Sequence, residues 1–506
     1  MSYLTKALAV IFVYLVFCGW ILWRHHKKTV LARLENQTDT SQRNHQSILV
    51  AYASQSGSAA AIARKTSESL KSTGLNVELH ALSAVDTAML QDFTRVLFIV
   101  STTGEGDPPE NAASFQQTVM QSEFTLPQLQ YGILALGDSS YTFFCGFGHA
   151  LDAWLQQTHA MPLFDLIEVD QLDDGAIRHW QSQLGLLANT TEMPDWEKPA
   201  YQSWVLDSRA QLNAGSVGAP VFHLQLSSQP PDMQWQAGDI AEIGPRNDSA
   251  SITQFLNLYA LDGTTATSEG NTFADALLDK LLPHDVTQKA EFSGMSPEAI
   301  LQSLKDLPHR EYSIASIPQD GQLELLIRQT HYPDGRLGIG SGWLTCHADI
   351  GTPIALRVRE NKAFHPPTDE KPLILIGNGT GIAGLRAHLK ARISQGHGNN
   401  MLIFGERNAE YDFYFKQELY AWLASGLLTR LETAFSRDQT ERIYVQDAVK
   451  SLGIEIQEWV KNGAAIYICG SANGMAPAVH SQLLAILGEN TLATLTATGR
   501  YRRDVY

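Results

Sequence analysis

Cysteine is scarce in this sequence, with only four residues in a chain of 506. Cys18, Cys145, Cys346 and Cys469 are widely spaced, without the pairing of a disulfide framework or the close spacing of a metal finger or iron-sulfur cluster. We therefore expect neither disulfides nor a bound metal. Reduced thiols are typical of proteins that stay in the cytosol.

Basic residues are also few, since 37 Lys and Arg stand against 53 Asp and Glu, for a formal net charge of -16. Such a chain repels a phosphate backbone unless a local basic patch dominates, and the sequence has no such patch, which excludes nucleic acid as a partner. Between Gln46 and Trp180 acidic residues outnumber basic ones 15 to 5. We expect this segment to attract a basic partner protein.

Long apolar runs are missing except at the start, where residues 4–23 are almost wholly apolar and long enough to span a bilayer as a helix. Arg24, Lys27 and Lys28 follow at once, so the positive-inside rule places the rest of the chain in the cytoplasm. A cleaved signal peptide is the alternative, but its charge would lie on the other flank. The sequence predicts a transmembrane anchor over 1–28, a flexible polar tether over 29–46, and a single-pass inner-membrane protein with cytoplasmic catalytic domains.

The remaining length exceeds what one hydrophobic core can hold, and it predicts about three domains. In the first, 47–188, three short apolar strands run into loops rich in Gly and hydroxyl groups at 54–58, 101–109 and 137–141. Helix capping alone would explain the first loop. Because the carboxyl ends of parallel strands meet at one edge of a doubly wound sheet, the three loops together favour a mononucleotide pocket.

A linker over 189–219 precedes the second domain, 220–366, where alternating strand patterns are interrupted by a helical insert at about 251–305. Arg310, Tyr312 and Ser313 share one short strand, and they offer the cation, ring and hydroxyl that a flavin dinucleotide needs. An ordinary strand could carry the same residues. A Gly-rich turn over 338–344 opens a helix, which suits a pyrophosphate.

The third domain, 367–506, begins with a strand, a glycine loop over 377–381 and a helix, the arrangement of a dinucleotide pyrophosphate site. Further on, Ser436, Arg437 and Tyr444 offer a hydroxyl, a cation and a ring suited to a 2'-phosphate and adenine, which favours NADPH over NADH. The chain ends on Tyr506, a ring able to cover the flavin face where nicotinamide must land.

In their order along the chain, these motifs resemble the diflavin reductases, and residues 136–145 are especially similar to the sulfite reductase flavoproteins of that family. The resemblance covers almost everything after about Ser47. It implies an α/β multidomain fold: a flavodoxin-like doubly wound sheet, an antiparallel β-barrel FAD domain with a helical insert, and a Rossmann-like NADPH domain, preceded by one transmembrane helix. It also implies FMN, FAD and NADPH as cofactors.

The resemblance further assigns roles to individual residues. The FMN phosphate is expected to bind Ser54, Gln55, Ser56, Gly57 and Ser58. The FMN ring is expected to lie between two loops and to stack on Tyr141. The loop residues are Thr102, Thr103, Gly104, Glu105, Gly106, Gly137, Asp138, Ser139 and Tyr141. FAD is expected to contact Arg310, Tyr312, Ser313, Gly338, Gly340 and Ser341. NADPH is expected to contact Gly379, Thr380, Gly381, Ser436, Arg437, Arg442, Tyr444 and Gln446. The catalytic set is Ser313, Cys469 and Asp504, with Tyr506 over the FAD ring.

Three departures from the family pattern accompany these assignments. Thr103 stands where many relatives carry an aromatic ring, Ser471 and Gly474 stand where relatives often carry an acid and a base, and the helical insert is short.

The implied reaction passes a hydride from NADPH to FAD, then single electrons to FMN and to a protein acceptor. We expect a membrane-anchored reductase whose acceptor is a haem- or metal-containing protein in the membrane. The alternative is the flavoprotein subunit of an NADPH-sulfite reductase. A scaffold protein with inactive flavin sites is a third reading, against which the complete set of Ser313, Cys469 and Asp504 argues.

Overall fold

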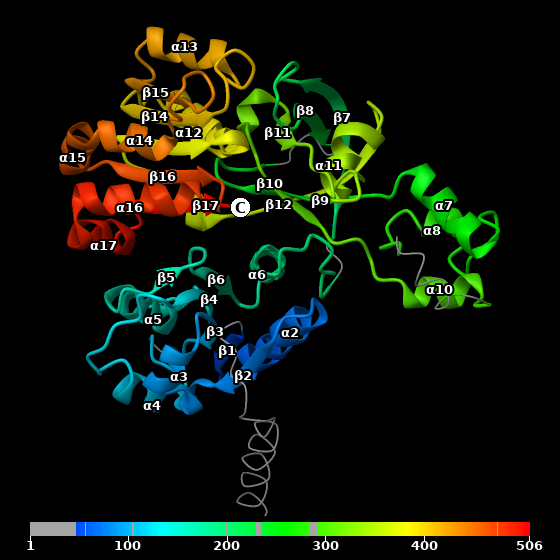
Figure 1. The fold of residues 1–506 in the computed structure, drawn as a ribbon, viewed down its shortest axis with the longest axis horizontal. Helices are drawn as coiled ribbons and strands as arrows, with labels where there is room; N and C mark the ends of the chain where they lie inside the picture. The colour runs from blue at the N-terminus through cyan, green and yellow to red at the C-terminus, as the bar shows by residue number, and fades with distance from the viewer. Residues whose placement is uncertain are drawn as a thin grey trace, which may run out of the picture.

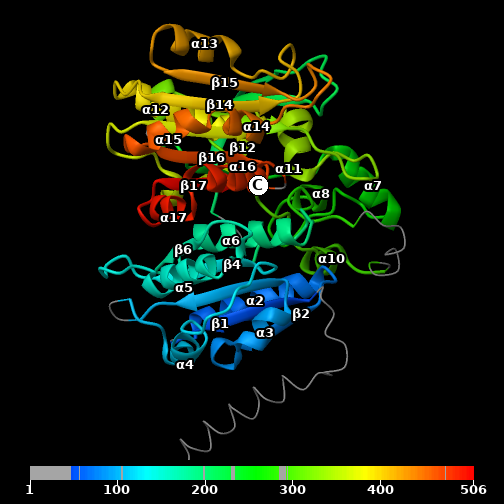
Figure 2. The same ribbon diagram turned by 60° about the vertical axis from the view of Figure 1, so that its left-hand side comes forward.

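The computed structural model describes residues 47–506 except 56, 104–105, 198–199, 229–233, 284–291, 293 and 473. Three folded units follow one another along the chain, and Figures 1 and 2 show the first unit, in blue to teal, lying against the other two. The chain ends near the middle of the molecule, where the three units meet (Figure 1). The last residues of the chain therefore lie close to elements that are far from them in the sequence.

The first unit is a parallel sheet with helices on both faces. Alternate residues of its first strand explain this, because Leu49 and Ala51 pack under helices α4 and α5, whereas Ile48 and Val50 pack under α2 and α6. The strands run in the order β2-β1-β3-β4-β5, with β6 beside β4. They are β1 (Ile48–Ala53), β2 (Val77–Ala81), β3 (Arg95–Ser101), β4 (Gln130–Gly137), β5 (Met161–Pro162) and β6 (Ile167–Asp170). The helices are α2 (Ser58–Ser72), α3 (Thr87–Asp92), α4 (Glu110–Thr118), α5 (Gly146–Gln157) and α6 (Asp174–Leu187).

The second unit is an antiparallel sheet in the order β10-β9-β12-β7-β8-β11. A single bridge between Ile314 and Leu325 joins its two edges, so the sheet curls into a barrel. The strands are β7 (Gln202–Gln211), β8 (Val221–Ser228), β9 (Ile240–Gly244), β10 (Arg310–Ser313), β11 (Leu323–Arg328) and β12 (Pro353–Arg359). The helices α7 (Ser249–Tyr259), α8 (Phe273–Ala276) and α10 (Pro297–Ser303) form an insert with its own apolar core, and α11 (Ile339–Gly342) follows β11.

The third unit is a second parallel sheet, in the order β15-β14-β13-β16-β17. Helices α12 and α13 cover one face and α14 and α16 the other. The strands are β13 (Leu373–Asn378), β14 (Asn400–Glu406), β15 (Arg430–Phe435), β16 (Ala465–Gly470) and β17 (Tyr501–Val505). The helices are α12 (Ile382–Ser394), α13 (Lys416–Ala424), α14 (Val445–Ser451), α15 (Gly453–Lys461), α16 (Met475–Leu487) and α17 (Glu489–Ala497). Two parallel sheets and one antiparallel barrel confirm the α/β multidomain class.

The predicted anchor and tether, 1–28 and 29–46, lie outside the described residues. Within the part of the chain that the structure describes, no helix has both the length and the apolar character needed to cross a bilayer. The longest helix there, α2, has 15 residues, and at 1.5 Å per residue this gives roughly 22 Å against a hydrocarbon core of about 30 Å.

Ion pairs between the units fix the first unit against the other two. Arg178 on α6 donates to Glu242 of β9 at 3.1 Å, and both side chains are almost fully buried. On the third unit, the guanidinium of Arg503 in β17 pairs with the carboxylate of Asp165, in the loop between β5 and β6. Helix α6 thus lies directly under the barrel strands, as Figure 1 shows.

His309 adds a pH-dependent contact to this junction. Its Nδ1 lies 2.6 Å from the Asp195 carboxylate, and burial, which alone would lower the pKa of His309, is outweighed by its bonds to Asp195 and Glu311, so that its pKa is about 9. Because the folded-state pKa lies above the unfolded value of about 6.5, protonation of His309 stabilises the fold. This stabilisation is complete below the unfolded pKa and is lost as the pH rises through the folded pKa.

We therefore expect the midpoint of thermal unfolding to fall between pH 7 and pH 9.5, by roughly 2–4 °C for each kcal/mol lost. The His309→Gln variant has no imidazole to titrate, and its midpoint should change less over the same interval. Scanning calorimetry of both proteins across that interval provides the comparison. Parallel pH profiles would contradict this role of His309.

Candidate functional site

The loop after β1 offers an anion site at the start of α2. Gly57 adopts a left-handed conformation with φ of +99° and donates its backbone N–H to Ser54 Oγ at 3.0 Å. Among the described residues no side chain caps this helix, and the N-terminus of a helix favours an anionic ligand. Gln55 is exposed beside them, Ser58 begins the helix, and Ser56 lies outside the described residues. These groups fit the phosphate of FMN.

Two further loops lie beside it at the carboxyl edge of the same sheet. Thr103 pairs with Asp107 through two backbone hydrogen bonds, which join the two sides of the first loop. Asp170 accepts from the backbone N–H of Ser139 at 2.8 Å and thereby holds the second loop. The ring of Tyr141, 49% exposed, is available for stacking. Thr102 and Gly106 belong to the first loop and Gly137 and Asp138 to the second, whereas Gly104 and Glu105 lie outside the described residues.

Phe143 is a candidate that the sequence analysis did not name. Its side chain is 60% exposed, and it packs so closely on Gly106 that a Cβ there would come within 2.9 Å of it. The second loop therefore carries two largely exposed aromatic residues, Tyr141 and Phe143, and Phe143 packs against the first loop. The sequence signal was the pair of residues Phe143 and Phe144, two positions after Tyr141.

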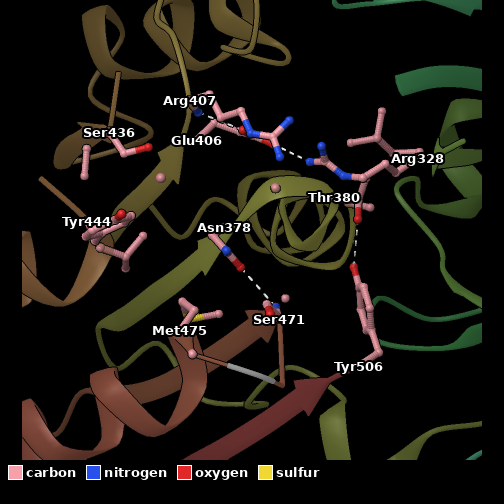
Figure 3. A pocket seen from close by; sticks show the side chains of 18 of the residues that line it. Arg328, Asn378, Thr380, Glu406, Arg407, Ser436, Tyr444, Ser471, Met475 and Tyr506 are labelled. Carbon is pink, nitrogen blue, oxygen red and sulfur yellow. Dashed lines mark hydrogen bonds and ion pairs between the residues drawn. The ribbon is translucent and has the colours of Figure 1, made fainter. Parts of the chain in front are cut away.

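A cavity of about 760 Å³ lies between the barrel and the third unit. It brings together nine of the predicted residues: Tyr312, Ser313, Gly379, Thr380, Ser436, Arg437, Tyr444, Gln446 and Tyr506. In Figure 3, Tyr506 lies beside Thr380 and across the cavity from Ser436 and Tyr444, with Asn378 between the two sides. The cavity thus extends from the predicted nicotinamide end to the predicted 2'-phosphate end.

Other predicted residues do not line this cavity. Arg310 directs its guanidinium to backbone carbonyls, including those of Thr191 and His309, and the hydroxyl of Ser341 bonds to Thr330 at 2.8 Å. Gly338 and Gly340 lie in the turn that forms α11. Gly381 is packed against β16, where a Cβ would come within 2.2 Å of the Cys469 carbonyl. Arg442 is exposed and outside the lining.

Ser313, Cys469 and Asp504 come together from three strands, with Ser313 in the cavity lining and the other two outside that lining. Ser313 Oγ donates to Asp504 Oδ2 at 2.8 Å, and Cys469 Sγ lies 3.6 Å from the same oxygen. Burial and the Asp504 charge raise the pKa of Cys469 well above its usual value, so the thiol stays neutral. Burial also raises the pKa of Asp504, while the bond from Ser313 opposes that rise. The arrangement places one carboxylate beside a hydroxyl and a thiol.

Tyr506 closes one end of the cavity with its ring 43% exposed. Its hydroxyl donates to Thr380 Oγ1 at 3.5 Å, and its backbone N–H donates to the carbonyl of Gly470 at 3.0 Å. The long hydroxyl contact leaves the ring easier to displace than the backbone that carries it.

The cavity also contains charged residues that the sequence analysis missed. Arg328 at the end of β11 pairs with Glu406 at the end of β14, and Arg407 follows directly (Figure 3). In the sequence, these residues show as a Glu-Arg pair at the end of a buried strand. Such a pair does not by itself indicate whether it lies in a cavity or on an exposed loop.

Glu242, His309 and Glu311 bring metal-ligand atoms within 4.8 Å of one another. Arg359 lies against both carboxylates, 3.4 Å from Glu242 and 3.5 Å from Glu311, and Arg178 bonds to Glu242 as well. Two guanidinium groups at these distances repel a cation, so this cluster is a network of ion pairs rather than a metal site.

Known proteins match this chain along most of its length. Residues 50–180 match the flavodoxin family model and residues 375–481 the oxidoreductase NAD-binding domain model. The chain is 30% identical to the "Sulfite reductase [NADPH] flavoprotein alpha-component" of Shewanella sp. (strain MR-7), over 91% of this chain and 90% of that protein. The protein of the same name from Shewanella oneidensis is also 30% identical, over 92% and 91%, and that from Vibrio vulnificus 29%, over 91% and 87%.

These matches also correct the predicted location. The names of the relatives describe an enzyme component and mention no membrane, and the described residues contain no helix able to cross one. The prediction of a single-pass inner-membrane protein is therefore wrong on these findings, and the haem acceptor within the membrane is not retained with it.

Proposed function

We propose that this chain, which belongs to the sulfite reductase [NADPH] flavoprotein alpha-component family of diflavin reductases, passes electrons from NADPH through FAD and FMN to a sulfite-reducing partner protein. The chain is an NADPH-dependent flavin oxidoreductase with FMN and FAD as cofactors. The acceptor is the new element, and the names of the relatives support it. The alternative predicted from the sequence, the flavoprotein subunit of an NADPH-sulfite reductase, thus replaces the membrane-anchored reductase.

The convergence of Ser313, Cys469 and Asp504 at the cavity is the observation that carries the reductase part of the proposal. When bound, NADPH and FAD would supply the hydride donor and acceptor. Ser313, which lines the cavity, would offer its hydroxyl to FAD, and Asp504 would hold a negative charge for the nicotinamide as it becomes positive. Tyr506, at one end of the cavity, would give way to the nicotinamide.

A two-stage assay tests the acceptor. The full-length protein should oxidise NADPH with ferricyanide, an artificial acceptor, but not with sulfite alone. Adding the sulfite-reducing component of a sulfite reductase should make NADPH oxidation depend on sulfite and yield sulfide. Ferricyanide reduction without any sulfite-dependent oxidation in the mixture would refute the sulfite assignment and leave the reductase assignment intact.

The flavin content gives a separate prediction. Acid extraction of the purified protein should release FMN and FAD in equal amounts, because each has its own site in a different unit. Tyr141→Ala should lower the FMN content and leave FAD unchanged, since the ring lies at the first unit alone. Chromatography of the extract measures both. Release of FAD without FMN from the unmodified protein would contradict the roles given to loop 54–58 and Tyr141.

A further inference from the structure

Strand β17, which carries Asp504, lies at the edge of its sheet and pairs with β16 only. An edge strand leaves one row of backbone groups without a strand partner. On β17, part of that row is covered by the first unit, because the backbone N–H of Arg503 donates to Asp165 Oδ2 at 3.0 Å. The first unit therefore supplies a contact that a neighbouring strand would otherwise make.

The side chain of Arg503 strengthens this contact. Its Nε donates to Asp165 Oδ1 at 2.7 Å, and its Nη2 bonds to the same oxygen. The Arg503 side chain is 12% exposed, so the pair is partly shielded from water. One carboxylate of the first unit thus holds both the backbone and the side chain of the residue next to Asp504.

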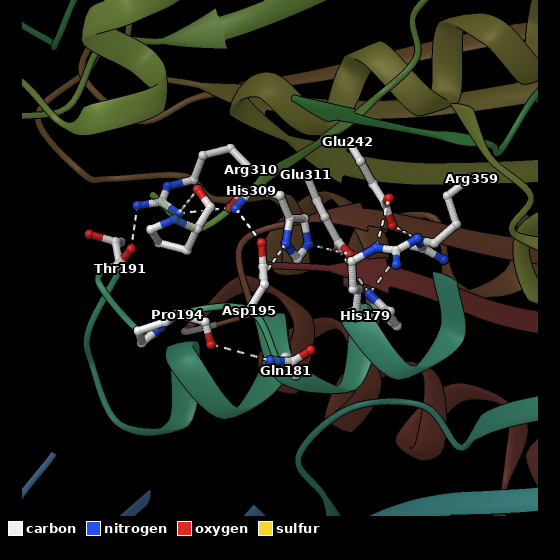
Figure 4. Close-up of polar contacts among 12 residues, drawn as sticks. His179, Gln181, Thr191, Pro194, Asp195, Glu242, His309, Arg310, Glu311 and Arg359 are labelled. Carbon is white, nitrogen blue, oxygen red and sulfur yellow. Dashed lines mark hydrogen bonds and ion pairs between the residues drawn. The ribbon is translucent and has the colours of Figure 1, made fainter. Parts of the chain in front are cut away.

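A second contact from the first unit reaches Glu311, on the strand that also carries Ser313. His179 on α6 lies with its Nδ1 2.9 Å from Glu311 Oε2 and 3.2 Å from Arg359 Nη2, as Figure 4 shows. Glu311 is two residues before Ser313 on β10, and Ser313 is the hydrogen-bond donor to Asp504. Burial raises the pKa of Asp504; the guanidinium of Arg359 opposes that rise, whereas the Glu311 carboxylate adds to it.

We propose that Asp165 and His179 of the first unit are positioning residues for Asp504, so that reduction of FAD by NADPH is fast only while the flavodoxin-like unit is docked against β17. This inference rests on the role of Asp504 under the proposed function. The reaction moves one hydride from NADPH to FAD and leaves NADP⁺; Asp165 and His179 exchange neither proton nor electron. They act by fixing the place and charge of one carboxylate.

The size of the effect follows from how steeply catalysis depends on placement. A displacement of about 1 Å at a reacting group can cost on the order of a hundredfold in rate, and loss of the Asp165 contact frees only one edge of β17. We therefore expect Asp165→Ala to slow FAD reduction by about fivefold to tenfold. Asp165→Asn keeps an oxygen that can accept from the Arg503 backbone, and its rate should lie between those of Asp165→Ala and the wild type.

The test is anaerobic stopped-flow reduction of the full-length protein by NADPH, followed at the flavin absorbance. Asp165→Ala and His179→Gln should lower the limiting rate at saturating NADPH while the NADPH concentration that gives half this rate stays the same. Glu489→Gln is the matched control, because Glu489 pairs with His159 at 3.6 Å between the same two units but away from β17. That control should reduce FAD at the wild-type rate.

A double-variant cycle separates positioning from a general loss of structure. If Asp165 acts through Asp504, adding Asp165→Ala to an Asp504→Asn protein should cost no further rate. An additive loss in that background would overturn the inference, as would wild-type rates in Asp165→Ala and His179→Gln. Should Asp165→Ala lose its flavins, Asp165→Asn and His179→Gln carry the comparison. A wild-type rate in Asp504→Asn alone would instead refute the role of Asp504 itself.

Discussion

Replacing Arg437 by Ala should weaken NADPH binding by about ten- to a hundredfold and leave NADH binding nearly unchanged, because a hydrogen bond to a charged group contributes roughly 1.5 to 3 kcal/mol. Arg437 lines the cavity, and its guanidinium forms no ion pair or side-chain hydrogen bond with any other residue that the structure describes. Ser436 lies next to it with a hydroxyl. A 2'-phosphate bound there would give the cation a partner that NADH does not offer.

Steady-state measurements with both nucleotides give the comparison directly. Arg442→Ala is the matched variant, since Arg442 comes from the same loop but does not line the cavity, and its loss for NADPH should be smaller. Equal losses for NADPH and NADH in Arg437→Ala would show that Arg437 does not recognise the 2'-phosphate.

Local sequence patterns predict much of the fold. Strands such as β1 and β13 are short apolar runs followed by loops with Gly and hydroxyl groups, and this turn chemistry is encoded within a few residues. Because parallel strands align their carboxyl ends, the sequence could place Thr380 and Ser436 at one edge without knowing the tertiary contacts. The cavity contains both.

Contacts between distant residues were beyond such patterns. Asp165 and Arg503 are 338 positions apart, and neither has a local signature that sets it apart from an ordinary surface charge. The same holds for Arg328 and Glu406, which meet only because β11 and β14 belong to adjoining units. Docking of one unit on another is decided by the whole surface, so these pairs become visible only in three dimensions.

Side-chain direction was the other limit. The resemblance predicts FAD contacts for Arg310 and Ser341; in the structure the guanidinium of Arg310 bonds to nearby carbonyls and the hydroxyl of Ser341 to Thr330. A motif fixes which residue is present, whereas its rotamer depends on neighbours contributed by other segments. The predicted anchor is a different case, because its long apolar run is plain in the sequence but lies outside the described residues.

Asp504→Asn should slow FAD reduction by roughly tenfold or more, which corresponds to about 1.4 kcal/mol of lost transition-state stabilisation. Asn keeps the shape of the side chain and can still accept from Ser313, so the variant removes the charge and little else. The positive charge on nicotinamide develops only as the hydride leaves. Nucleotide affinity should therefore change little, because the lost interaction belongs to the transition state.

The pH dependence of the same rate provides the sharper measurement. Asp504 is faced by His179 on α6, Glu311 on β10, Arg359 on β12 and Cys469 on β16, and burial raises its pKa despite the hydrogen bond from Ser313 and the guanidinium of Arg359. The wild-type rate of FAD reduction should fall as pH decreases through this raised pKa, since the carboxylate then takes a proton. Asp504→Asn has no such group and should lose the acid limb of the profile, whereas Asp504→Glu should retain it. A wild-type rate with an unchanged acid limb in Asp504→Asn would show that another group supplies the charge beside the nicotinamide.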